Sequence, residues 1–387
     1  MPSSQISTAK YNEFDLLCLL AAVDPPPQRI ESFANWNFST LDWNDFLHLA
    51  HRHGVLPLAA RNLIQHAPGI PPEAERNLRA AYENNLKRSL WFTAELARIM
   101  QHFERRQLRA IPYKGPLLAQ LVYGDPGLRN FSDLDFLISA AGFDRAKHAL
   151  AEMGYRPSLQ MTPAVERFWL RKGNERAFDG EAGKYLVELQ WALFPRFYAI
   201  DLPVEKLLSR ARSTVVGAQE MPSLSPEDLL LALCLHAAKH LFARLIWLVD
   251  IAETLRSQTP DYAAVLARAR QHGIVRILGV SFWLVKNLLD AGLPAPAEEI
   301  ITADPLVPVL GKEFAARLAR NAIYDFESTE YFRLILKLRE QRADRWRYAA
   351  RLLSTPGDGD LAMIRLPEGL FPLYRIVRIA RLLRKLT

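Results

Sequence analysis

The chain has 387 residues, of which half are hydrophobic and 24% are charged. This composition is typical of a folded globular protein, and it excludes a disordered chain, a collagen-like fibre and a small disulfide-rich scaffold. The length suggests two or three domains rather than one.

The net charge of +7 is concentrated near the C-terminus. Residues 331–387 contain 13 Lys and Arg but only 5 Asp and Glu, so the rest of the chain is close to neutral. A basic surface is typical of nucleic-acid binding. The charge therefore makes the C-terminal region, and not the body of the protein, the candidate for such a contact.

The cysteine content indicates a reducing compartment, and the apolar segments indicate neither a secretory signal nor a membrane span. Cys18 and Cys234 both lie in apolar runs, where a free cysteine behaves as a small buried hydrophobic residue. The first residues have neither the basic region nor the apolar stretch of a secretory signal, and no stretch reaches about 18 uninterrupted apolar residues. We therefore expect a cytoplasmic protein without a transmembrane segment.

The first part of the chain, residues 1–104, is expected to be helical. From Glu73 to Met100 apolar residues recur mostly every three or four positions, which predicts a long amphipathic helix. Gly54 and the proline-rich segment 68–72 predict turns between the helices that precede it.

The next part of the chain mixes strands and helices. The run LRAIPYKG predicts a short strand, followed by a helix with Gly115 as its N-cap and Pro116 at its first position. The run SDLDFLIS predicts a second strand, with Asp133 and Asp135 on one face and apolar residues on the other. Segment 176–193 predicts a hairpin with a glycine-containing turn.

From Ser225 the pattern is helical again, since a capping serine, a proline and two acidic residues begin a long apolar helix. The sequence therefore predicts an α+β fold, in which a small mixed-sheet core is embedded in mostly helical N- and C-terminal regions. We divide the chain into an N-terminal helical region, an α/β core, a second helical domain and a C-terminal helical region with a basic terminal helix, at residues 1–104, 105–200, 201–300 and 301–387.

Asp133 and Asp135 are the first candidates for chemistry. At positions i and i+2 of a strand, their side chains are about 7 Å apart along the chain and point the same way. Most such pairs are solvated, but these lie in a strongly apolar strand, where two like charges are costly unless a cation neutralises them. A pair of Mg²⁺ ions bound in this way promotes in-line phosphoryl displacement. Glu188, on the second strand of the hairpin, is the natural third carboxylate.

A longer pattern contains this pair. The pattern begins with Lys114 and Gly115 between a strand and a helix, and after a tight turn it continues with Arg129, Ser132 and the two aspartates. This order of residues and elements resembles the nucleotidyltransferase superfamily of the DNA polymerase β type. More narrowly, the chain resembles the bacterial family of uncharacterised nucleotidyltransferases over about residues 45–260. Members of that family carry a downstream helix with a His-x-x-Lys-His motif, followed by Arg and Asp. Here this element contains His236, Lys239, His240, Arg244, Trp247 and Asp250.

The resemblance implies transfer of a nucleotidyl group from a nucleoside triphosphate, with ATP expected, to an unknown small-molecule, peptide or protein acceptor. It implies Mg²⁺ or Mn²⁺ as the cofactor, and it places the segment 201–300 against the substrate or nucleotide. The residues that would hold the metal and act in catalysis are Asp133, Asp135 and Glu188. The residues that would bind the nucleotide are Lys114, Gly115, Arg129 and Ser132.

Two positions depart from the family pattern. Gly115 is followed by Pro116 where the superfamily usually has Gly-Ser or Gly-Gly, so the hydroxyl that often touches the phosphates is absent. Gln190 stands where the narrower family often has His. The departure at Pro116 supports an alternative, a catalytically inactive nucleotide- or peptide-binding accessory protein with the same fold.

His236 and His240 share one helix face and allow three interpretations. Two zinc ligands would use this spacing, although no third ligand accompanies them in the motif. A structural role, by capping or by pairing with Asp250, is the second interpretation. The third is contact with nucleotide or acceptor, together with Lys239 and Arg244, and the family likeness favours it.

The C-terminal helix is amphipathic. Its apolar side contains Leu373, Ile376, Val377, Ala380, Leu383 and Leu386, and its basic side contains Arg375, Arg378, Arg381 and Lys385. We expect it to pack on the body of the protein with its basic face in solvent. Binding to an anionic membrane or to RNA is the alternative, and RNA binding would indicate an RNA-directed nucleotidyltransferase.

Overall fold

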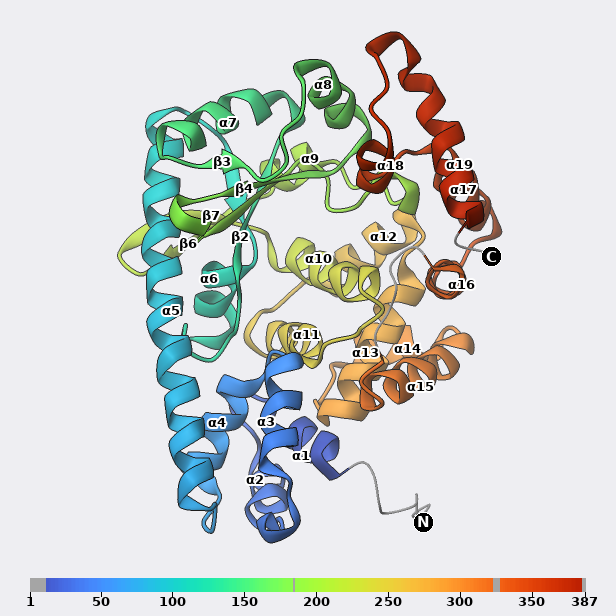
Figure 1. Ribbon diagram of the computed structural model, residues 1–387. Helices are drawn as coiled ribbons and strands as arrows, with labels where there is room; N and C mark the ends of the chain where they lie inside the picture. The colour runs from blue at the N-terminus through green and yellow to red at the C-terminus, as the bar shows by residue number, and fades with distance from the viewer. Residues whose placement is uncertain (1–11, 184, 323–327, 385–387) are drawn as a thin grey trace.

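The computed structural model describes residues 12–183, 185–322 and 328–384, and it confirms the α+β fold (Figure 1). The helices are α1 Asn12–Leu20, α2 Pro27–Ala34, α3 Trp43–Arg52, α4 Leu56–His66, α5 Pro72–Arg105, α6 Gly115–Leu118, α7 Phe143–Glu152, α8 Pro163–Lys172, α9 Val204–Ser209, α10 Pro226–Lys239, α11 Leu245–Ser257, α12 Tyr262–His272, α13 Val275–Leu289, α14 Ala295–Thr302, α15 Leu306–Ala319, α16 Thr329–Leu338, α17 Arg342–Ser354, α18 Asp358–Met363 and α19 Tyr374–Arg384. The strands are β1 Ala110–Pro112, β2 Asp133–Ile138, β3 Arg156–Pro157, β4 Glu175–Asp179, β5 Leu186–Gln190, β6 Arg212–Val216 and β7 Gln219–Ser223.

The longest helix, α5, runs along one edge of the molecule beside the sheet (Figure 1). Its 34 residues confirm the amphipathic helix predicted from Glu73 onward. Leu96, Ile99 and Phe103 lie on its buried face at spacings of three and four residues. They share an apolar core with the strands, so this helix supports the sheet that carries the candidate site.

Five strands form one mixed sheet in the order β1-β2-β5-β4-β3. The strands β2 and β5 are parallel, whereas the other neighbours are antiparallel. In the parallel pair, Asp135 lies opposite Glu188. Because side chains alternate along a strand, Asp133, Asp135 and Glu188 share one face of the sheet.

The two faces of this sheet differ in polarity. Leu134, Phe136 and Val187 point away from the carboxylates into the core shared with residues of α5 and α7. The alternation therefore explains how an apolar strand presents acidic side chains on its other face. The predicted strand at SDLDFLIS and the predicted hairpin of β4 and β5 are both confirmed.

The helix α10 lies within the helical part of the molecule, and almost all of its residues are buried. A helix that is apolar on most sides is expected in such a position. Its start confirms the predicted cap, because the Ser225 hydroxyl accepts a hydrogen bond from the Asp228 N–H. Pro226 follows at the first helical position, as the sequence indicates.

The two-stranded sheet of β6 and β7 is not predicted from the sequence. It lies in a segment that is expected to be helical. Val215, Val216 and Gly217 supply the β-branched residues and the turn glycine of a hairpin. Each strand has only five residues, and their polarity does not alternate clearly, so the pattern is too weak to recognise.

The buried side of the C-terminal helix α19 differs from the prediction, although Arg375 is exposed as expected. Arg378 is fully buried and the side chain of Arg381 is 14% exposed, and both form ion pairs with the buried Asp360 on α18. Ile376 and Leu383 are exposed instead, at 63% and 57%. The prediction of a solvated basic face is therefore wrong for Arg378 and Arg381, because a buried carboxylate is costly without cationic partners.

One large apolar core contains residues from all four sequence segments and extends from Phe14 to Tyr348. The division of the chain at residues 104, 200 and 300 stays a prediction. Lys385 and Leu386, which belong to the predicted terminal helix, lie outside the described residues. Among the helices of the described part of the chain, none is long and apolar enough to cross a membrane.

Candidate active site

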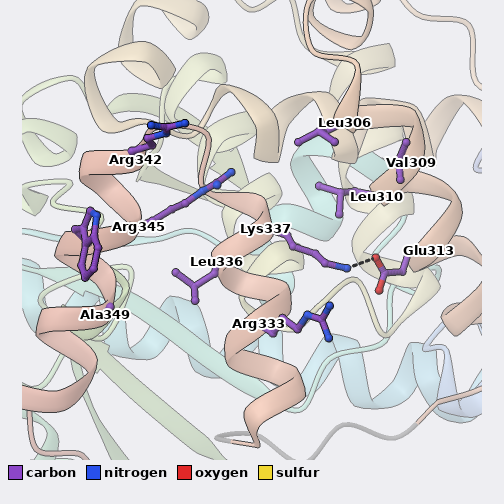
Figure 2. A pocket seen from close by; sticks show the side chains of 11 residues that line it. Leu306, Val309, Leu310, Glu313, Arg333, Leu336, Lys337, Arg342, Arg345 and Ala349 are labelled. Carbon is purple, nitrogen blue, oxygen red and sulfur yellow. Dashed lines mark hydrogen bonds and ion pairs between the residues drawn. The ribbon is translucent and has the colours of Figure 1, made fainter.

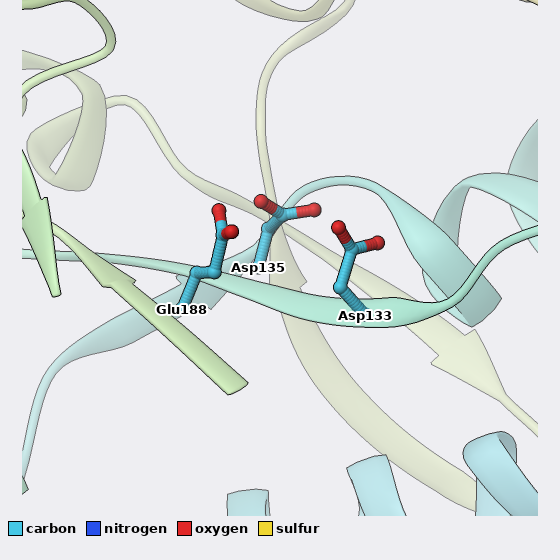
Figure 3. A group of neighbouring side chains, drawn as sticks. All are labelled: Asp133, Asp135 and Glu188. Atoms are coloured by element: carbon cyan, nitrogen blue, oxygen red, sulfur yellow. The ribbon is translucent and has the colours of Figure 1, made fainter. Parts of the chain in front are cut away.

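Three carboxylates gather on the polar face of the sheet (Figure 3). Asp133 and Asp135 project from β2 and Glu188 from β5, and their candidate ligand oxygens all lie within 4.8 Å of one another. Asp135 is buried, whereas the other two are half-buried. In the described ranges, this is the one group of three or more His, Cys, Asp or Glu side chains that could share a metal ion.

The two oxygens of Asp135 have different surroundings. Oδ1 accepts a hydrogen bond from Gln190 Nε2 at 2.7 Å and lies 3.1 Å from Lys114 Nζ. Oδ2 is buried and has no hydrogen-bond partner among the described residues. A buried oxygen without a partner is costly, and a cation would satisfy it. Three carboxylates are hard oxygen ligands, so the donor set fits Mg²⁺ or Mn²⁺.

Burial and mutual repulsion disfavour the charged forms of these carboxylates. Burial, followed by the negative charges of Asp135 and Glu175, raises the pKa of Glu188 to about 8. Burial and the charge of Asp135 also raise the pKa of Asp133. Lys114 opposes both shifts. A divalent cation would supply further positive charge and favour the ionised carboxylates.

Gln190 connects two of the three carboxylates. Its amide nitrogen donates to Asp135 at 2.7 Å and to Glu188 at 2.9 Å, and its amide oxygen accepts from the Tyr113 hydroxyl at 2.7 Å. It is 3% exposed. The residue that departs from the family pattern therefore holds the carboxylates in position, a role that its place in the sequence did not indicate.

Gly115 allows Lys114 to reach the carboxylates. Its φ of +58° is left-handed, and a Cβ at this position would lie 3.1 Å from the backbone oxygen of Asp133. Glycine is suited to both constraints because it has no Cβ. The helix α6 begins at Gly115 with Lys114 as its N-cap, so the predicted N-cap at Gly115 is wrong by one residue. The helix has only four residues and continues as a π-helical turn, Ala119–Tyr123.

Arg129 is fixed by a buried ion pair with α11. Its Nε and Nη2 each lie 2.8 Å from an oxygen of Asp250, and Asp250 Oδ1 also accepts a hydrogen bond from the Tyr123 hydroxyl at 2.6 Å. A bidentate pair of this kind has a defined geometry, so it ties the segment before β2 to α11. Asp250 is thus bound by Arg129 and Tyr123, and the role of Arg129 in nucleotide binding stays a prediction.

His236, His240 and Trp247 form an aromatic wall, with ring centroids between 4.8 and 5.3 Å apart. Burial, followed by the positive charge of Lys114 for His236 and of Lys239 for His240, lowers the pKa of both histidines well below the usual value. Both imidazoles are therefore neutral at pH 7. The zinc interpretation gains no support, because no third ligand joins them anywhere in the described part of the chain.

Asp133, Asp135 and the aromatic wall line one pocket of about 680 Å³, a size typical of small-molecule sites. The predicted site residues in its lining are Lys114, Arg129, Ser132, Asp133, Asp135, His236, His240 and Arg244. Gly115, Glu188 and Lys239 do not line it. The backbone oxygen of Lys239 accepts a hydrogen bond from the Tyr331 hydroxyl at 2.8 Å.

Two arginines of the pocket, Arg52 on α3 and Arg88 on α5, come from positions that no motif marks. Among the described residues, these two and Arg244 have uncharged partners. Arg52 donates to the backbone oxygen of Asn321, Arg88 donates to the side chain of Asn130, and Arg244 lies 5.9 Å from the ring centroid of Trp247. Their charges therefore remain available to an anionic ligand.

The helix that carries Trp247 begins against His53, the residue that follows α3. The N–H groups of Leu245 and Ile246 donate to the Nδ1 and the backbone oxygen of His53, at 3.3 and 3.1 Å. The N-cap residue of α11, Arg244, forms no capping bond with its own side chain. His53 therefore satisfies free N–H groups at the start of this helix and links the N-terminal helices to the pocket.

Comparison with protein families agrees with the chemistry of this site. The model of the family described as "Uncharacterised nucleotidyltransferase" matches residues 39–290, more than half of the chain. The matched range includes the three carboxylates and the aromatic wall. Neither a curated protein nor a solved structure matches the chain. The protein belongs to the uncharacterised nucleotidyltransferase family.

Proposed function

We propose that the protein transfers a nucleotidyl group from a nucleoside triphosphate, with ATP as the expected donor, to a hydroxyl or phosphate of an acceptor. The acceptor oxygen forms a bond to the α-phosphorus while the bond from that phosphorus to the α–β bridging oxygen breaks. The electron pair leaves with pyrophosphate, and the acceptor proton passes to Glu188 or to water. The observation that carries this proposal is the cluster of three carboxylates with an unpartnered oxygen on Asp135.

Asp133, Asp135 and Glu188 would hold the divalent cation, Mg²⁺ or Mn²⁺. When bound, such a cation neutralises phosphate charge and stabilises the entering and leaving oxygens. Lys114 offsets part of the charge of Asp135, and Gln190 orients two carboxylates before any substrate arrives. Positioning and electrostatic stabilisation by these residues would therefore supply most of the catalysis.

The lining of the pocket supports a polyphosphate substrate. Arg52, Arg88 and Arg244 bring positive charge to the pocket that also contains Asp133 and Asp135. A triphosphate carries several negative charges, and the guanidinium group binds phosphate oxygens in a bidentate manner. The neutral aromatic wall offers flat surfaces against which a nucleobase or a planar acceptor can pack.

The proposal is tested with the wild type and two variants, each of which loses one negative charge. Asp133→Asn removes a proposed metal ligand, whereas Asp144→Asn removes an exposed carboxylate on α7. We expect the wild type to bind a non-hydrolysable ATP analogue more tightly with Mg²⁺ than without it. We also expect it to label a component of a heat-treated cell extract from α-³²P-labelled ATP, with release of pyrophosphate.

Asp133→Asn should lower metal-dependent labelling by about 100-fold or more, while Asp144→Asn retains it. Thermal unfolding of both variants verifies that they are folded. Full metal-dependent pyrophosphate release by Asp133→Asn would refute the proposal.

The alternative is a nucleotide-binding accessory protein without turnover. It is favoured by Pro116, which stands where the superfamily usually has a small residue, often serine. Binding of the ATP analogue that does not depend on Mg²⁺, together with no labelled product from any fraction of the extract, would support it. RNA-directed transfer has a weaker basis, because Arg378 and Arg381 pair with Asp360 and do not contribute to a solvated basic face.

A further inference from the structure

A second pocket lies in the C-terminal region, outside the range that matches the family (Figure 2). It has a volume of about 680 Å³ and lies between α15, α16 and α17. We call it the C-terminal groove. Its lining residues are Leu306, Val309, Leu310, Glu313, Arg333, Leu336, Lys337, Arg342, Arg345, Trp346 and Ala349.

Three apolar residues of the C-terminal groove are exposed, whereas Leu310 between them is buried. Leu306 is 44% exposed, Val309 58% and Trp346 78%. On α15, Leu306, Val309 and Leu310 lie at positions i, i+3 and i+4, so they form one stripe along the helix. A cluster of exposed apolar side chains with a polar rim is typical of an interaction site, and tryptophan often supplies much of the binding energy there.

Positive charge surrounds this apolar stripe. Arg333, Lys337, Arg342 and Arg345 all line the C-terminal groove, whereas Glu313 is its single carboxylate. Lys337 Nζ lies 2.9 Å from the Glu313 carboxylate, an ion pair drawn in Figure 2. Of the other cations, Arg333 and Arg342 are exposed and form no ion pair with any described residue. The groove therefore presents an excess of positive charge beside apolar surface.

We propose that the C-terminal groove binds an acidic amphipathic helical segment of a partner protein. Apolar side chains on one face of such a helix would pack on Leu306, Val309 and Trp346, and its Asp and Glu side chains would face Arg333 and Arg342. The apolar residues line a hollow between helices, which suits an inserted helix better than the flat surface of a bilayer.

The helix α15 connects this groove to the candidate active site. Leu306 at its start lines the C-terminal groove, and Ala322, just after its end, lines the pocket with the carboxylates. At about 1.5 Å of rise per residue, the two positions are roughly 25 Å apart. A partner held in the groove would therefore contact the same helix that ends beside the candidate active site, although binding itself requires no nucleotidyl transfer.

The test selects ligands without assuming their sequence. The immobilised full-length protein is presented with a phage-displayed library of random 16-residue peptides. We expect enrichment of peptides that combine Asp and Glu with apolar residues at i, i+3 or i+4, and i+7. A synthetic copy of an enriched peptide is then titrated by fluorescence anisotropy against the wild type and variants.

Trp346→Ala, and the double change Arg333→Glu with Arg342→Glu, should each weaken binding of this peptide by about tenfold or more. Matched controls are Trp91→Ala, at a tryptophan 66% exposed on α5, and Arg76→Glu, at an exposed arginine on the same helix. Both controls should bind as the wild type does. None of these measurements depends on catalytic activity, so failure here and failure of the proposed function are distinguishable.

The proposal is overturned if no peptide is enriched, if the enriched peptides are not acidic, or if Trp346→Ala binds them as well as the wild type does. Co-sedimentation with vesicles of phosphatidylserine and phosphatidylcholine provides the remaining comparison. Vesicle binding that the same variants abolish, without peptide binding, would assign the groove to an anionic membrane instead.

Discussion

Gln190 shows how far the candidate site depends on hydrogen bonds between strands. Its amide nitrogen donates to Asp135 and Glu188, and the Tyr113 hydroxyl binds its oxygen, so the amide has one favoured orientation. A neutral donor can hold two carboxylates close together without cancelling their charge. The charge therefore remains available to a metal ion.

We expect Gln190→Leu to weaken binding of Mn²⁺ by about 10- to 100-fold, the usual effect of losing a residue that supports metal ligands. Leucine has a similar size but cannot donate to Asp135 or Glu188, and it leaves the Tyr113 hydroxyl without an acceptor. Gln190→His restores a ring N–H donor and should recover part of the affinity. Mn²⁺ affinity is measured by electron paramagnetic resonance, and an unchanged affinity in Gln190→Leu would contradict this role.

The carboxylates of the candidate site could be predicted from the sequence more readily than the residues that support them. Asp133 and Asp135 are recognisable because the alternation within one strand places them together. The contact between Gln190 and Asp135 joins residues 55 positions apart and depends on the register of β5 against β2. No local pattern encodes that register.

Among the elements, α11 depends for its start on His53, the C-cap residue of α3. The Nδ1 of His53 accepts a hydrogen bond from the Leu245 N–H, so this nitrogen carries no proton. Burial, followed by the positive charges of Arg52 and Arg244, lowers the pKa of His53 to about 4. The folded protein therefore keeps this imidazole neutral over a pH range in which an exposed histidine becomes charged.

This shift predicts a loss of stability in mild acid. The unfolded chain binds a proton at His53 near its usual pKa of about 6.5, whereas the folded protein does so only near pH 4. The free energy of unfolding should therefore be unaffected by this residue above about pH 6.5 and should fall between pH 6.5 and 4, by on the order of 3 kcal/mol. Urea unfolding at several pH values measures this slope.

His53→Asn provides the control for this prediction. The asparagine oxygen can accept the Leu245 N–H as Nδ1 does, but the side chain does not titrate in this range. Its free energy of unfolding should change less between pH 7 and 5 than that of the wild type. Parallel curves for the two proteins would show that His53 is not the source of the pH dependence.

The two helix starts differ in how well they can be predicted. The start of α10 is encoded locally, because Ser225 and Pro226 form a recognisable cap at the beginning of an apolar run. The start of α11 depends on His53, which lies 192 residues earlier than its partner Leu245. A cap of this kind is a tertiary contact and leaves no local signal.

At the scale of the whole molecule, α19 places aliphatic side chains on the surface. Ile376 and Leu383 are more than half exposed, and the inward face of the helix carries Arg378 and Arg381. The amphipathic pattern predicts two faces but not which of them is buried. The choice depends on Asp360 of α18, a tertiary partner that the periodicity of α19 cannot reveal.

We expect this surface to promote self-association at high salt. The net charge of +7 keeps molecules apart at low ionic strength, and salt screens that repulsion without weakening apolar contacts. Sedimentation velocity should show more association in 1 M than in 0.1 M sodium chloride, and Ile376→Glu should reduce it. Leu90→Glu, at a leucine 52% exposed on α5, is the matched control. An equal reduction in both variants would exclude α19 as the cause.

The parallel pairing of β2 and β5 also determines when the candidate metal site forms during folding. Parallel strands need a crossover, and here it contains α7, β3, α8 and β4. Contacts so far apart along the chain form slowly, because the entropy of closing the loop is lost before the contacts stabilise it. The three carboxylates meet only when this crossover is complete, so the divalent cation proposed above would bind the finished sheet and would stabilise it by mass action. The supply of divalent metal in the cell would then set the lifetime of the folded protein against proteolysis, in addition to its activity.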